Sequence, residues 1–141
     1  MNFKRFIIGG FVIFIIFQIL DFLIHNILLM PLYASMSNIW RPDMMSKMWI
    51  MYISSFIFSF IMMYLFIKGY EARGLMEGIR FGLIIGFMTN GTGAFYQYAV
   101  YPITFNLALQ WFIFGVLECA IVGAAAALIY KPLEDFSDDY S

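Results

Sequence analysis

Two carboxyl groups and one imidazole stand inside long apolar stretches of this sequence. Asp21 and His25 are four residues apart in one stretch, and Glu118 lies in another. Residues four apart share one face of an α-helix, so the Asp21 carboxyl and the His25 imidazole can meet. Such a pair can hold a proton or orient the imidazole toward a ligand. These three side chains are therefore the first candidates for chemistry.

Uncharged polar side chains occur in the same apolar stretches and can supply the donors that a buried carboxyl requires. The predicted polar pocket consists of Gln18, Asp21, His25, Ser55, Ser59, Asn90, Thr92, Gln97 and Glu118. Two interpretations stay open: hydrogen bonds between helices that fix their packing, or a site for a proton, an ion or a small ligand. One histidine with scattered carboxyls has no metal-ligand spacing, so we predict no metal and no cofactor.

The composition is typical of an integral membrane protein. Hydrophobic residues make up 63% of the 141 residues, charged residues only 12%, and the mean hydropathy is +0.85. Average soluble domains have ~45–50% apolar and ~25% charged residues. The net charge of −1 provides no basic surface, which argues against nucleic acid as a partner. The lipid bilayer is the partner that this composition predicts.

Four apolar stretches are long enough to cross the bilayer, which takes roughly 20 helical residues. Pro31 ends the first stretch, Asp43 is a predicted N-cap before the second, Pro102 marks a tight turn, and Pro132 closes the last. The predicted spans cover residues 6–30, 48–67, 79–101 and 105–130. We expect an all-α fold, an up-down-up-down four-helix transmembrane bundle over residues 1–132, followed by a short acidic cytoplasmic tail at 133–141.

The distribution of basic residues predicts the orientation of this bundle. Cytoplasmic loops carry an excess of Lys and Arg. Six basic residues fall on one side and only Arg41 and Lys47 on the other, which places both termini in the cytoplasm. The six are Lys4, Arg5, Lys68, Arg73, Arg80 and Lys131.

At ~1.5 Å of rise per residue, the polar groups lie roughly 7–21 Å below the outer surface. The pocket is therefore predicted to open outward.

Small residues recur at every fourth position in the third and fourth predicted spans. The third span carries one such stripe and the fourth carries another. In lipid, stripes of small residues let two helix backbones approach closely. We expect the two spans to form a close antiparallel hairpin. The residues predicted to pack the helices are Gly78, Gly82, Gly86, Gly115, Cys119 and Gly123.

Five short motifs are spread over most of the chain. They are Asp21-x3-His25-Asn26, Pro31-x-Tyr33, Trp40-Arg41-Pro42, Lys68-Gly69-Tyr70-Glu71 and Ala99-Val100-Tyr101-Pro102-Ile103. Together they resemble a group of small, uncharacterised four-span bacterial membrane proteins. The resemblance implies a four-helix membrane fold in a bacterial inner membrane. It implies no assigned activity and transfers no catalytic residue.

Three classes of function remain. The class that we favour is a structural or accessory subunit, which assembles with itself or with other membrane subunits. The second is a proton-linked or small-solute carrier that uses Asp21, His25, Asn90 and Glu118. The third is an enzyme that acts on a lipid or quinone at the outer leaflet. No nucleophile–base pair, P-loop or multi-histidine motif is present in the sequence, which argues against the enzyme.

Overall fold

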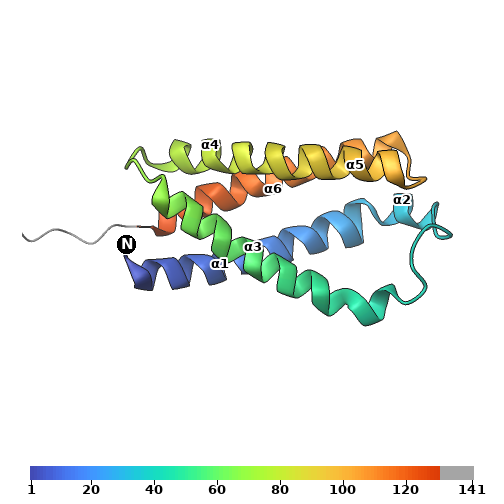
Figure 1. Cartoon of the computed structure of the whole chain (residues 1–141), viewed down its shortest axis with the longest axis horizontal. Helices are drawn as coiled ribbons and strands as arrows, with labels where there is room; N and C mark the ends of the chain where they lie inside the picture. The colour runs from blue at the N-terminus through green and yellow to red at the C-terminus, as the bar shows by residue number, and fades with distance from the viewer. Residues whose placement is uncertain (131–141) are drawn as a thin grey trace, which may run out of the picture.

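The regular elements of the chain are all helical in the part that the structure describes. This structure is a computed structural model, and it describes residues 1–130 (Figure 1). The elements are α1 (Phe3–Leu23), the π-helical turn η1 (Ile24–Leu28), α2 (Met30–Ala34), the 3-10 turn η2 (Met44–Lys47), α3 (Met48–Lys68), α4 (Leu75–Gly86), the π-helical turn η3 (Phe87–Gly91), α5 (Thr92–Val100) and α6 (Phe105–Ile129). Pro132 and the predicted acidic tail lie outside the described residues.

Three helical stretches are long and apolar enough to cross a membrane. They cover Phe3–Leu28, Met44–Lys68 and Phe105–Ile129. The predicted helical, membrane-type character of the chain is confirmed to this extent. The predicted third span, residues 79–101, is divided among α4, η3 and α5. Of these, α4 has 12 residues and α5 has 9, so neither alone reaches the roughly 20 residues that a crossing requires.

Helices α4 and α6 approach so closely that their backbones touch along the stripes of small residues. A Cβ atom added to Gly78 would collide with the carbonyl oxygen of Gly123, and one added to Gly82 would collide with that of Cys119. At Gly86 the obstacle would be the Cα atom of Val116. The structure thus brings Gly78 and Gly82 of one stripe against Cys119 and Gly123 of the other, and Figure 1 shows α4 alongside α6. This contact fixes the position of α6 relative to the chain that leads into η3.

Helix α3 packs mainly against α1. Gly9 and Gly10 of α1 lie under the side chains of Met63 and Phe60, and Phe6 contacts Phe60 edge to face. Figure 1 shows that α3 crosses α1 and that its N-terminal end diverges from α5. The close contact of α1 with α3 thus lies around Gly9 and Gly10, and the N-terminal end of α3 lies apart from α5.

Side-chain caps begin two of the long helices, whereas Asp43 occupies the N-cap position of η2 without a side-chain hydrogen bond to the backbone. The amide of Leu107 donates to Thr104 Oγ1 (3.2 Å) at the start of α6. Asp43 instead accepts from Arg41 Nε (3.0 Å) and lies 3.0 Å from Lys47 Nζ. These two cations, Arg41 first, hold the pKa of Asp43 below its usual value. Both cations reach the Asp43 carboxylate, so it forms ion pairs on the surface and does not cap α3.

Candidate functional site

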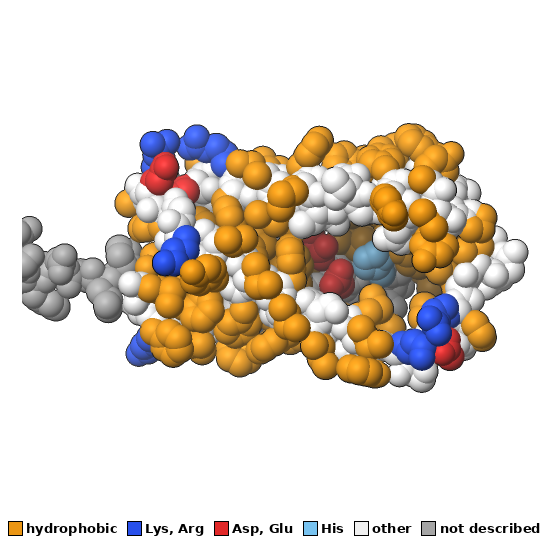
Figure 2. Space-filling model, in the orientation of Figure 1, with side chains coloured by type: hydrophobic (Ala, Val, Ile, Leu, Met, Phe, Trp, Pro, Cys, Tyr) orange, Lys and Arg blue, Asp and Glu red, His pale blue; other side chains and the backbone are white. Residues whose placement is uncertain are grey.

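A cavity of about 350 Å³ lies between the C-terminal part of α1 with η1, the η3–α5 region and α6; we call it the acidic cavity. Two carboxyl residues, Asp21 and Glu118, line it, and Lys or Arg is absent from its described lining. Figure 2 shows acidic side chains and the histidine at the bottom of a hollow on the side of the bundle. The described lining is Asp21, Ile24, His25, Thr89, Asn90, Gly93, Ala94, Gln97, Trp111, Phe114, Gly115 and Glu118.

Glu118 is the feature that most needs explanation. Its residue surface is only 8% exposed, and its Oε1 atom is buried without a hydrogen-bond partner. Across residues 1–130, Oε1 is the one buried side-chain oxygen or nitrogen in this condition. A buried polar atom without a partner costs about 1–3 kcal/mol, and more if it is charged. An arrangement of this kind is stable when a proton, an ion or a ligand satisfies the carboxyl group.

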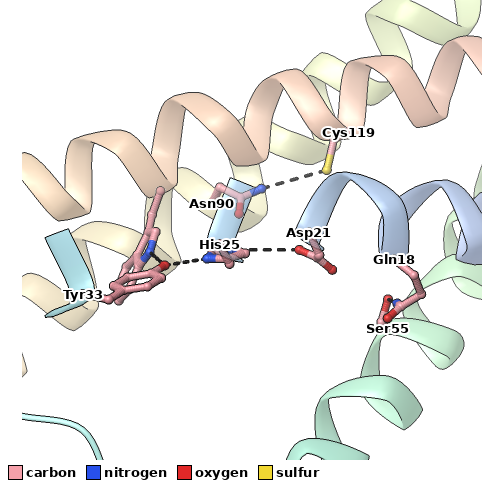
Figure 3. A network of polar contacts seen from close by, with 8 residues as sticks. Gln18, Asp21, His25, Tyr33, Ser55, Asn90 and Cys119 are labelled. Carbon is pink, nitrogen blue, oxygen red and sulfur yellow. Dashed lines mark hydrogen bonds and ion pairs between the residues drawn. The ribbon is translucent and has the colours of Figure 1, made fainter. Parts of the chain in front are cut away.

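A chain of polar contacts reaches the cavity from the segment that follows η1 (Figure 3). Trp111 Nε1 donates to Tyr33 Oη (2.7 Å), and Tyr33 Oη is 2.5 Å from His25 Nδ1. On the other side of the imidazole ring, His25 Nε2 is 3.8 Å from Asp21 Oδ1. The rings of Tyr33 and His25 are also nearly parallel, with 6° between their planes. The chain therefore fixes the imidazole ring beside the cavity.

The direction of these hydrogen bonds follows from which of the indole, hydroxyl and imidazole groups can donate a proton. An indole N–H can only donate, so Tyr33 Oη accepts from Trp111 and keeps its own proton free. In the neutral state of His25, the tyrosine hydroxyl then donates to Nδ1, and the imidazole proton lies on Nε2. The remaining N–H therefore faces Asp21. The arrangement orients the ring so that a proton or positive charge at Nε2 lies beside a carboxylate.

Two π-helical turns place these side chains. His25 lies in η1 (Ile24–Leu28), and Thr89 and Asn90 lie in η3 (Phe87–Gly91). A π-turn inserts extra backbone into a helix and changes the direction of the following side chains, often at functional sites. The pattern of apolar residues in a sequence does not distinguish such turns from ordinary α-helix. Their occurrence on both sides of one cavity indicates that the site is shaped by backbone geometry as well as by residue type.

Asn90 links the cavity wall to the helix packing. Its Nδ2 atom is 3.3 Å from Thr89 Oγ1 and 3.9 Å from Cys119 Sγ. A Cβ atom at Gly115 would collide with the Asn90 side chain, so the glycine makes the space that the amide occupies. Gly115 thus accommodates Asn90, which follows Gly86 by four residues.

A second cavity of about 290 Å³ lies between α1 and α3; we call it the α1–α3 cavity. It shares Asp21 and His25 with the acidic cavity. Gln18 Nε2 donates to Ser55 Oγ across it (2.9 Å). Its described lining is Gln18, Asp21, Phe22, His25, Asn26, Met48, Met51, Tyr52 and Ser55.

The structure distributes the predicted pocket residues over these two cavities. Gln97 joins Asp21, His25, Asn90 and Glu118 in the acidic cavity, whereas Gln18 and Ser55 belong to the α1–α3 cavity. Two predicted residues line neither cavity. Their hydroxyls satisfy helix carbonyls instead, because a serine or threonine can bond four residues back along its own helix. These bonds are Ser59 Oγ to Ser55 O and Thr92 Oγ1 to Met88 O, both 2.7 Å.

Two functional residues were missed in the sequence. Neither Tyr33 nor Trp111 is among the predicted pocket residues, although both belong to the polar chain that reaches the cavity. They are 78 positions apart, so no local spacing relates them. The available signal was that a tyrosine hydroxyl and an indole N–H in an apolar setting require partners.

No family model, curated protein or solved structure matches this chain. Groups of three or more His, Cys, Asp or Glu side chains that are arranged to hold a metal are absent from residues 1–130.

Proposed function

We propose that this chain is a multi-pass membrane carrier for a small solute that is cationic and donates hydrogen bonds. The observation that carries the proposal is the unpartnered Oε1 atom of Glu118 beside a cavity of about 350 Å³. Cavities of ≈ 300–1,000 Å³ are typical of sites for small molecules. The solute would bring the donors that Glu118 lacks in the described chain.

The charges around the cavity support a cation. Asp21 and Glu118 both line the cavity, and basic side chains other than His25 do not occur in its described lining. Two carboxyls in a site of low polarity favour either protonation or a bound positive charge. The aromatic rings of Trp111 and Phe114 also line the cavity, and ring faces attract cations. A polar cation would therefore find both carboxyl oxygens and ring faces.

Glu118→Gln should weaken binding of guanidinium ion by at least tenfold. Guanidinium is a suitable probe because it keeps its charge at neutral pH and donates hydrogen bonds to carboxylates in a planar fork. The measurements are titration of tryptophan fluorescence, since Trp111 lines the cavity, and uptake of labelled guanidinium into proteoliposomes.

Glu71→Gln is the matched control, because it removes one exposed carboxylate far from the cavity lining. It should leave guanidinium binding and uptake unchanged. Equal binding by wild type and Glu118→Gln, or no binding by wild type, would contradict the proposal. If Glu118→Gln is also neutral or stabilising in a thermal melt, the structural or accessory role is favoured, because an amide is cheaper to bury than a carboxylate.

The proposed topology has four spans with both termini in the cytoplasm. The third span in chain order would be the continuous helical run of α4, η3 and α5, about 26 residues from Leu75 to Val100, which is sufficient for a crossing. The basic asymmetry supports this orientation, since the connection around Arg73 would lie inside and that around Arg41 outside. The acidic cavity would then lie in the outer half of the bundle.

Single cysteines should report this topology. In intact cells an impermeant maleimide should label Ser37→Cys and spare Glu71→Cys, because only the first connection would face outward. Both residues are exposed, so accessibility does not bias the comparison. The wild-type protein is the negative control, because its native Cys119 is buried and should not react. Labelling of Glu71→Cys alone would reverse the orientation, and labelling of both would contradict the number of crossings between them.

A further inference from the structure

We infer that the solute is an amphiphile, with a cationic head in the acidic cavity and an apolar tail in the α1–α3 cavity. This inference rests on the proposed function and specifies its substrate class. The two cavities share Asp21 and His25, so a molecule that reaches these residues touches both spaces. The head and the tail would meet at this shared wall.

The linings of the two cavities differ in the way that an amphiphile requires. The acidic cavity has the buried carboxyl of Glu118 and the amides of Asn90 and Gln97. Most of the lining surface of the α1–α3 cavity is apolar; Phe22, Met48 and Met51 line it beside the polar residues Gln18, Asn26, Tyr52 and Ser55. The thioether side chain of methionine is flexible and adapts to apolar ligands of variable shape. The polar lining suits a head group and the apolar lining suits a hydrocarbon chain.

The side of the bundle provides a route from the bilayer. The N-terminal half of α3 diverges from α5, and the hollow that exposes the acidic side chains and the histidine opens there (Figures 1 and 2). Figure 2 shows apolar side chains along parts of the rim of this hollow, between uncharged polar side chains and backbone. Large apolar residues near the N-terminal end of α3 are exposed, including Trp49, Met51 and Tyr52. In a membrane this opening faces lipid, so an amphiphile can enter laterally while its tail stays in an apolar medium.

An n-alkylguanidinium series should separate the contribution of the tail from that of the head. We expect affinity for the protein in nanodiscs, referred to the probe concentration in water, to rise by up to about fourfold for each methylene between ethyl and octyl, the value for complete removal of a methylene from water. The affinity should then level off when the α1–α3 cavity is full. Binding is measured by tryptophan fluorescence, and the signal of Glu118→Gln at each chain length corrects for partition of the probe into the bilayer.

Met51→Trp should fill the α1–α3 cavity and remove most of the gain with chain length, while guanidinium itself binds as in wild type. Ile53→Trp is the matched control, because Ile53 is exposed on the same helix and lines neither cavity. Met48→Trp fills the same cavity and replaces Met51→Trp if that variant does not fold.

The outcomes distinguish this inference from the proposed function. Guanidinium binding that depends on Glu118, with the same chain-length gain in Met51→Trp and Ile53→Trp, would overturn the inference and leave the proposed function intact. Equal affinity for guanidinium and for the longer n-alkylguanidinium ions would also overturn the inference and leave the proposed function intact. Failure of every member of the series to bind would overturn both.

Discussion

Gly82→Leu should prevent α4 from packing against α6 and make the chain aggregate when it is extracted in mild detergent. Even a Cβ atom at Gly82 would collide with the carbonyl oxygen of Cys119, and Ala120 Cα lies just behind. These obstacles are backbone atoms, which cannot change rotamer. The helices would have to separate along the whole stripe, so the loss of stability should exceed the ~1–3 kcal/mol typical of overpacking.

Gly93→Leu is the control for this substitution. It makes the same change at a helical glycine whose added Cβ would meet open space. Thermal aggregation of both variants in one detergent, followed by size-exclusion chromatography, measures the difference. Gly82→Leu should lose its monodisperse peak, and Gly93→Leu should retain it. Equal melting of the two variants would show that the α4 stripe does not pack against α6.

Tyr33→Phe should have the second-largest effect, because one hydroxyl connects three elements. Its removal leaves the indole N–H of Trp111 and Nδ1 of His25 without this partner, at about 1–3 kcal/mol for each group that water does not reach. The aromatic ring stays, so the edge-to-face contact with Trp40 is kept. The expected result is a lower melting temperature together with loss of the fixed imidazole orientation.

Nuclear magnetic resonance of the imidazole nitrogens can test this prediction. In wild type the Nδ1 signal of His25 should report a strong hydrogen bond, and Tyr33→Phe should remove it. Tyr52→Phe is the control, since Tyr52 lies near His25 in the α1–α3 cavity and its hydroxyl is not bonded to the imidazole. An unchanged nitrogen spectrum in Tyr33→Phe would contradict the polar chain from Trp111 to Asp21.

Much of the fold was predictable because membrane helices follow simple rules. The length of the apolar runs identifies the stretches around α1, α3 and α6. Gly78, Gly82 and Gly86 recur at intervals of four residues, which predicts a close helix contact. Both signals are local and depend on one residue property. The division of the third stretch by η3 was not predictable, since the residues of a π-turn have no distinctive apolar pattern.

The candidate site was predictable only for groups that are costly in lipid. Asp21, His25, Asn90 and Glu118 were grouped by that cost alone, and the structure places all four around one cavity. Spacing could not show that the pocket is divided in two, because the division depends on how far α3 diverges. It also could not relate Tyr33 to the site, since their contact depends on the path of the chain after η1.

The most direct test of solute binding is photo-crosslinking with a guanidinium compound that carries a diazirine on a short chain. The products are mapped by mass spectrometry on the protein in nanodiscs. We expect labelled peptides to contain Ala94 or Phe114, which line the acidic cavity, and we expect excess guanidinium or Glu118→Gln to abolish the label. Label that is scattered over exposed apolar residues outside the cavity, such as Ile15 and Leu128, and that is unaffected by Glu118→Gln, would contradict a solute site in this cavity.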